Sequence, residues 1–110
     1  SAEDMKTFCP TWTEEQRALR AEWLHSCDLH AIDTAYKGFH TDDIHQDLPH
    51  LDLPMRLVVA GASPVIEEAD IAEFKRLAPS IEITTVEGAG HMIPWDDLDG
   101  FLRAVSDFRI

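Results

Sequence analysis

The chain has 110 residues, of which 45% are hydrophobic and 27% charged, so it is long enough for one compact domain and too short for two ordinary ones. Its 21 acidic residues outnumber the 9 basic ones, and the net charge of -12 disfavours nucleic acids and anionic membrane surfaces as partners. No apolar run approaches the roughly 20 residues that span a bilayer, and no signal-peptide pattern opens the chain.

The first half of the chain has the periodicity of helices. A helix is predicted over residues 13–26, and a second over 28–36, which Gly38 is placed to end. Residues 40–48 are expected to form a short helical turn. Two prolines bracket residues 50–53, which indicates an extended linker because proline cannot continue a helix.

The second half alternates strands and helices. The apolar run 55–60 predicts a strand buried on both faces, and the β-branched run 81–86 predicts another. Helices are expected over 67–77 and 95–108. This order is typical of the βαβ unit of a parallel sheet. Since two strands alone leave open edges and faces, we expect these two to form the edge of a larger sheet.

The motif with the clearest chemistry is Gly88-Ala89-Gly90-His91, directly after the second predicted strand. The two glycines permit a tight backbone, and ligands of open α/β sheets bind at the carboxyl ends of the strands. Imidazole titrates near neutral pH and can transfer a proton. His91 is therefore either a general base or a residue that caps the next helix or hydrogen-bonds within its loop.

Three stretches of sequence carry a resemblance to a known family. PMRLVVAG, PVI and VEGAGHMIPWDD, followed by an amphipathic helix, resemble the carboxyl-terminal end of an α/β-hydrolase over residues 54–108. The resemblance implies an α/β fold that contains the last two parallel strands with their helices. It assigns residues 1–50 to the end of a helical cap and residues 51–110 to the core. GAGHMIPWDDLDGF is also similar to a narrower group of bacterial hydrolases, the N-formylmaleamate deformylase-like group.

The resemblance implies a hydrolase that cleaves a small amide or ester by Ser-His-Asp acyl transfer, without a cofactor, and with His91 as the base. The family's nucleophile is a serine in G-x-S-x-G, and Ser63 in GASPV is a near miss. Pro64 has no N–H for the oxyanion hole, which makes Ser63 a poor nucleophile. Many members carry the triad acid near this position, but a hydroxyl cannot stabilise an imidazolium, and Asp70 is expected to face water from a helix. Both groups are expected in the missing N-terminal half of the hydrolase, in the same or a separate chain.

Other residues are candidates for the substrate pocket. Those at the junction of cap and core are His40 and Asp43, and those beside the presumed site are Val65, Ile66 and Met92. As ordinary core residues, Val65, Ile66 and Met92 would fit the sequence equally well. Most histidines recur at intervals of five or ten residues, which sweep around a helix instead of lining one face, so no metal site is expected.

Two cysteines, Cys9 and Cys27, allow one disulfide at most, and reduced thiols in a cytoplasmic protein are predicted. A second hypothesis for the whole chain is a non-catalytic fragment or interaction module that keeps only the structure of a hydrolase ending. The lack of a G-x-S-x-G motif favours it. A stand-alone enzyme that pairs Ser63 or a cysteine with His91 has the least support.

Overall fold

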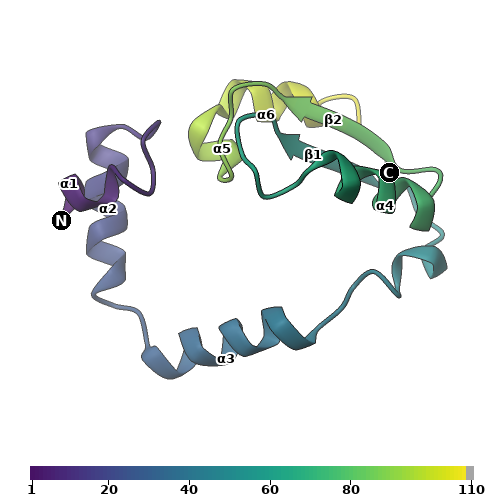
Figure 1. Cartoon of the computed structure of the whole chain (residues 1–110). Coiled ribbons are helices and arrows are strands. Elements are labelled where there is room, and N and C mark those ends of the chain that lie inside the picture. Colours follow the sequence, from purple (N-terminus) through teal and green to yellow (C-terminus); the bar gives the residue numbers. More distant parts are fainter. Residues whose placement is uncertain (109–110) are drawn as a thin grey trace. The chain divides into compact units, whose positions relative to one another are not determined.

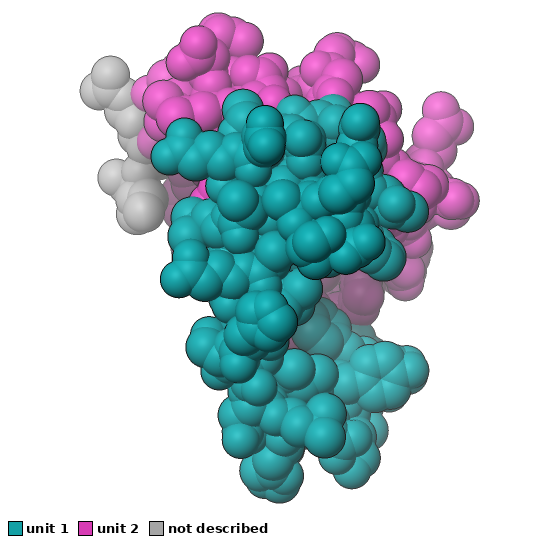
Figure 2. All heavy atoms as spheres, turned by 90° about the vertical axis from the view of Figure 1, so that its left-hand side faces the viewer, with its two compact units in different colours: residues 1–43 teal, residues 44–110 magenta. Residues whose placement is uncertain are grey.

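The computed structural model describes residues 1–108 and divides the chain into two compact units, residues 1–43 and 44–110 (Figures 1 and 2). Each unit is described by itself. The expected division into cap and core at residue 50 falls inside the second unit, and that assignment stays a prediction. Within residues 1–108, no helix combines the length and apolar character needed to cross a bilayer.

The first unit contains three helices, α1 (Ala2–Met5), α2 (Glu14–Leu24) and α3 (Leu29–Thr41). Helix α2 matches the prediction and begins with a capping box. Helix α1 was not predicted, because four residues are too few to show a helical periodicity. Helices α1 and α2 pack together, and the buried residues of the unit lie in them and in the segment between them: Met5, Cys9 and Trp12.

The prediction that Gly38 ends the second helix is wrong. Helix α3 continues through Gly38 to Thr41, and among the described residues only Gly88 has a positive φ. An ion pair between Lys37 and Asp33, 2.6 Å long and one turn apart, crosses the preceding part of the helix. The helix ends where the backbone turns extended at residue 42.

The helical turn expected over residues 40–48 is also wrong. The chain leaves the helical conformation at Asp42, and a 3₁₀ helix, η1, spans Leu48–His50 instead. Pro49 lies in the first turn of η1, where its missing N–H has no cost. Leu48 is buried, whereas the few other apolar residues of this stretch cannot anchor a longer helix.

A parallel strand pair is the centre of the second unit, as predicted. Strand β1 (Arg56–Ala60) pairs with β2 (Glu82–Val86), and helix α4 (Glu68–Leu77) connects them (Figure 1). Within β1 only Val59 is buried and the other residues are half-buried, so the expectation of burial on both faces is not met. Too few elements cover the strand pair to enclose it.

The last predicted helix is divided in two. Helices α5 (Ile93–Asp96) and α6 (Leu98–Val105) meet at Asp97, whose φ of -149° and ψ of 84° are not helical. The Asp97 carboxylate accepts a hydrogen bond from the Gly100 N–H at 2.8 Å and so caps α6. One continuous helix was predicted because the apolar pattern continues across Asp97 and does not show that this residue caps a new helix.

Helix α6 buries its small residues and not its largest ones. Gly100 and Ala104 are buried, whereas Leu98 and Leu102, expected on the packed face, are 56% and 51% exposed. A Cβ at Gly100 would lie 2.7 Å from Val86, so glycine permits this close approach of α6 to β2. The core consists of Val86, Ala89 and Ala104, with Val58 and Ile93 against it.

Candidate functional site

The site is built on two loops that follow the carboxyl ends of β1 and β2. The Gly61 N–H donates to the Val86 carbonyl at 3.0 Å, and the Ala62 N–H donates to the Ala89 carbonyl at 2.9 Å. These bonds extend the pairing of the strands into the loops. A Cβ at Gly61 would lie 3.0 Å from the Glu87 Cα, so the close approach of the two loops depends on glycine.

The loop after β2 places His91 beside the end of β1. Gly88 has a φ of +77°, which glycine adopts without strain and other residues rarely do. Ala89 is 1% exposed and fixes the middle of the loop in the core. His91 follows and is exposed, directly before Met92, the N-cap residue of α5.

A pocket of about 120 Å³ lies between the two loops. Only two of the side chains that line it are polar, the hydroxyl of Ser63 and the imidazole of His91, and none is a carboxylate or a permanent cation. The remaining wall is apolar. The lining residues are Val58, Ala60, Ser63, Val65, Ile66, His91 and Ile93.

The structure brings three predicted site residues to this pocket: His91, Val65 and Ile66. Met92 is not among them: it is the N-cap residue that precedes α5, and it is 42% exposed. His40 and Asp43 belong to the first unit, where the His40 Nδ1 lies 2.8 Å from the Tyr36 carbonyl. A pocket role for these two residues stays a prediction.

Two residues weighed as catalytic partners have local structural roles. The Ser63 hydroxyl accepts a hydrogen bond from the Val65 N–H at 3.3 Å, which closes a small turn around Pro64. Asp70 does not simply face water: it is half-buried, and its carboxylate accepts from the Glu67 N–H at 2.8 Å at the start of α4. Within residues 1–108, these two side chains bond to the backbone N–H groups of Val65 and Glu67 and not to the imidazole of His91.

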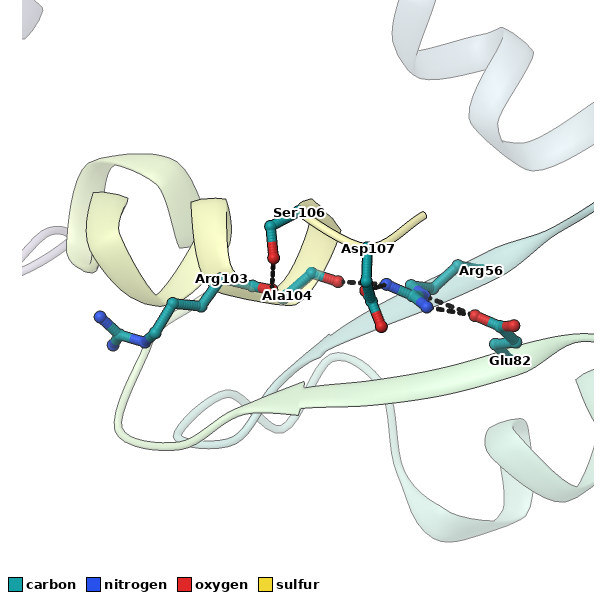
Figure 3. Close-up of polar contacts among 6 residues, drawn as sticks. All are labelled: Arg56, Glu82, Arg103, Ala104, Ser106 and Asp107. Atoms are coloured by element: carbon teal, nitrogen blue, oxygen red, sulfur yellow. Dashed lines mark hydrogen bonds and ion pairs between the residues drawn. The ribbon is translucent and has the colours of Figure 1, made fainter. Parts of the chain in front are cut away.

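At the opposite ends of the strands, Arg56 forms a cluster that the sequence reasoning missed (Figure 3). Its guanidinium donates to the carboxylates of Glu82 and Asp107 and, at 2.7 Å, to the Ala104 carbonyl. The hydrogen bond from Arg56 lowers the pKa of Asp107 below its ordinary value. Arg56 and Glu82 begin the two strands in register, and this cross-strand charge pair was a usable signal.

Metal-ligating and thiol groups are dispersed. No three His, Cys, Asp or Glu side chains within residues 1–108 are grouped so that they could hold a metal ion. The two cysteines are free thiols, Cys9 buried and Cys27 exposed.

Comparison with known proteins identifies one clear relative in sequence. The chain is 56% identical to N-formylmaleamate deformylase of Pseudomonas putida over 108 residues, which make up 98% of this chain and 40% of that protein. No family model matches the chain. The chain thus spans less than half the length of the curated relative.

Two crystal structures are among the solved structures with a similar fold. An N-formylmaleamic acid deformylase from Pseudomonas putida is 59% identical with a TM-score of 0.82, over 96% of this chain and 42% of that one. E-2-(acetamidomethylene)succinate hydrolase has the same TM-score of 0.82 at 19% identity, over 97% of this chain and 43% of that one. The second likeness concerns the fold alone. The chain therefore has the fold of the carboxyl-terminal portion of an α/β-hydrolase, and its sequence resembles N-formylmaleamate deformylase.

Proposed function

We propose that this chain is the carboxyl-terminal part of a hydrolase that cleaves a small amide or ester, and that His91 is its general base. One observation carries the proposal: His91 lines a largely apolar pocket at the carboxyl ends of β1 and β2. The 56% identity to a deformylase supports a formamide as the bond that is cleaved.

The proposed reaction is acyl transfer through a serine outside this chain. His91 accepts the serine proton as the serine oxygen bonds to the acyl carbon, and returns that proton to the nitrogen as the C–N bond breaks. Water then attacks the acyl-enzyme and gives a proton to His91, which passes it to the departing serine oxygen. Because no carboxylate lines the pocket, the acid that stabilises the imidazolium also comes from outside the chain.

The proposed partner is the remaining, N-terminal part of the hydrolase fold, in the same or a separate chain. The 40% coverage of the deformylase supports this, and so does an apolar stripe on α3. Its residues follow one another at intervals of three, four and three, as on a helix that packs against another. They are 50% to 88% exposed: Leu29, Ile32, Tyr36 and Phe39.

The alternative function, a non-catalytic module, is favoured by the Ser63–Pro64 turn, which leaves no nucleophile elbow beside His91. Under either function, the two free thiols support a cytoplasmic location.

A chimera separates the two functions. In it, this chain replaces the matching 108-residue stretch of the Pseudomonas putida deformylase, and a fluorophosphonate probe reports an activated serine. We expect the folded chimera to take the label on a serine of the deformylase part, and the isolated 12.4 kDa chain to take none. Label on Ser63 would contradict the proposal, and a folded chimera without label would favour the non-catalytic module.

A further inference from the structure

We propose that Asp96 is a positioning residue that acts through Gly90 to hold His91 at the pocket. This inference rests on the proposed function, since it concerns the residue that would move the proton. Asp96 ends α5, five positions after His91, and its side chain is half-buried. It does not line the pocket, so it does not act on a substrate directly.

The Asp96 carboxylate lies where a side chain at position 90 would begin. A Cβ built on Gly90 would lie 2.9 Å from Asp96 Oδ2 and 3.5 Å from its Cγ. The carboxylate therefore occupies the space that any other side chain at position 90 would fill. Gly90 does not have a positive φ, so its backbone conformation does not require glycine, and a Cβ at position 90 would instead force the Asp96 carboxylate to move.

This contact completes the support of the loop. The Ala62 N–H holds the Ala89 carbonyl from the side of β1, and Gly88 provides the turn. Asp96 supports Gly90 from the side of α5, next to the exposed His91. Without the Asp96 carboxylate, Gly90 loses a neighbour. The fraction of molecules in which the His91 imidazole is positioned to accept the proton then falls.

The neighbouring acids have different roles and provide controls. Asp97 caps α6 through the Gly100 N–H, so its removal tests helix stability. Asp99 is exposed in the first turn of α6 and has the same charge as Asp96. Asp99→Ala is therefore the matched control for the loss of one carboxylate in this segment.

The first test compares Asp96→Ala with Asp99→Ala in the deformylase chimera. A misplacement of a reacting group by about 1 Å can cost on the order of 100-fold in rate. We expect Asp96→Ala to lower kcat by about 10- to 100-fold with KM nearly unchanged, and Asp99→Ala to leave both nearly unchanged. Thermal unfolding midpoints identify any variant that loses activity because it is unfolded. Equal kcat values in the two folded variants would overturn the inference.

The second test uses the steric clash expected between a Cβ at position 90 and the Asp96 carboxylate. Gly90→Ala alone places a Cβ against the Asp96 carboxylate and should lower kcat. In the Asp96→Ala background that carboxylate is gone, so the added methyl should cost much less. Equal losses from Gly90→Ala in both backgrounds would overturn the inference, whether or not Asp96→Ala folds poorly. If His91→Ala retains full activity the proposed function fails, whereas inactive His91→Ala with unaffected Asp96→Ala rejects only the role of Asp96.

Discussion

The two ends of the β1–β2 pair hold different kinds of residue. At the amino ends, the Arg56 side chain is only 10% exposed and bonds to two carboxylates and to the carbonyl of Ala104 (Figure 3). At the carboxyl ends, His91 lies exposed beside a pocket that contains no carboxylate. At one end of the strands a guanidinium is paired with two carboxylates, whereas at the other end an ionisable group lies open to solvent.

From this difference we expect the amino ends of the strands to contribute to the stability of the fold and the carboxyl ends to contribute to catalysis. The Arg56 cluster joins β1, β2 and the end of α6, so its loss loosens three elements at once. Within residues 1–108, no ion pair and no hydrogen bond holds the His91 side chain, so its removal costs the fold little. Substitutions at the carboxyl ends should change turnover, and substitutions at the amino ends should change unfolding.

The largest expected effect is that of His91→Ala. Removal of a triad histidine costs on the order of a million-fold in kcat, because the serine loses its base. We expect such a loss in the chimera, with an unchanged thermal unfolding midpoint. Ser63 lines the same pocket, and Ser63→Ala is the control, with an expected loss below about tenfold because the proposed nucleophile lies outside this chain. Substantial activity in His91→Ala would show that the carboxyl ends do not carry the chemistry.

Arg56→Met should have the opposite profile. Methionine keeps much of the apolar stem but leaves the Ala104 carbonyl and two carboxylates without their donor. The unfolding midpoint should fall by more than in the exposed-charge variant Asp99→Ala, whereas kcat of the folded chimera should change by less than about threefold. A loss of kcat without a loss of stability would remove the distinction between the two ends.

A pair of glycine substitutions tests the loop more finely. Gly88→Ala forces alanine to a φ of +77° without any steric clash, and should lower the free energy of unfolding by about 1 kcal/mol. Gly38→Ala, inside α3, should instead raise helix stability by up to about 1 kcal/mol. Urea unfolding measures both. A neutral or stabilising Gly88→Ala would mean that the loop does not hold Gly88 in the left-handed conformation.

The smallest effect is the pH dependence of Asp107. Because Arg56 lowers the pKa of the folded-state carboxyl, the ionised form stabilises the fold above the ordinary pKa of 3.8. That contribution is lost as the pH falls through the lowered folded-state pKa. Asp107→Asn should therefore destabilise the chain at neutral pH, and its difference from wild type should vanish in strong acid. Urea midpoints at several pH values test this, and a constant difference at all pH values would contradict it.

The sequence was sufficient where local pattern and packing agree. The β-branched run at 81–86 and the apolar run at 55–60 predicted the strands to within one residue of their bounds. The two glycines before His91 predicted its loop, because glycines directly after a strand favour a tight turn. The sequence pattern gave wrong helix ends at Gly38 and Asp97. Either residue type can end a helix or lie within one, and which of these occurs depends on the neighbouring residues in the fold.

The site was only partly predictable for a related reason. Val65 and Ile66 lie close to His91 in the fold because backbone bonds join the two loops, and adjacency of the strand ends was enough to expect it. The closeness of Asp96 to Gly90 depends on the path of α5, which the sequence pattern merged with α6. The proposed cover of the α3 stripe is the N-terminal part of the hydrolase, so no pattern within this chain identifies the residues that would contact it.

The central claim is that this chain completes a hydrolase site, and turnover by the chimera tests it most directly. The measurement is the rate at which the folded chimera releases formate from N-formylmaleamate, beside that of the parent Pseudomonas putida deformylase. Since the chain is 56% identical to the stretch that it replaces, we predict a kcat within about tenfold of the parent. A chimera that folds with the parent's thermal stability and yet shows no turnover would contradict the claim.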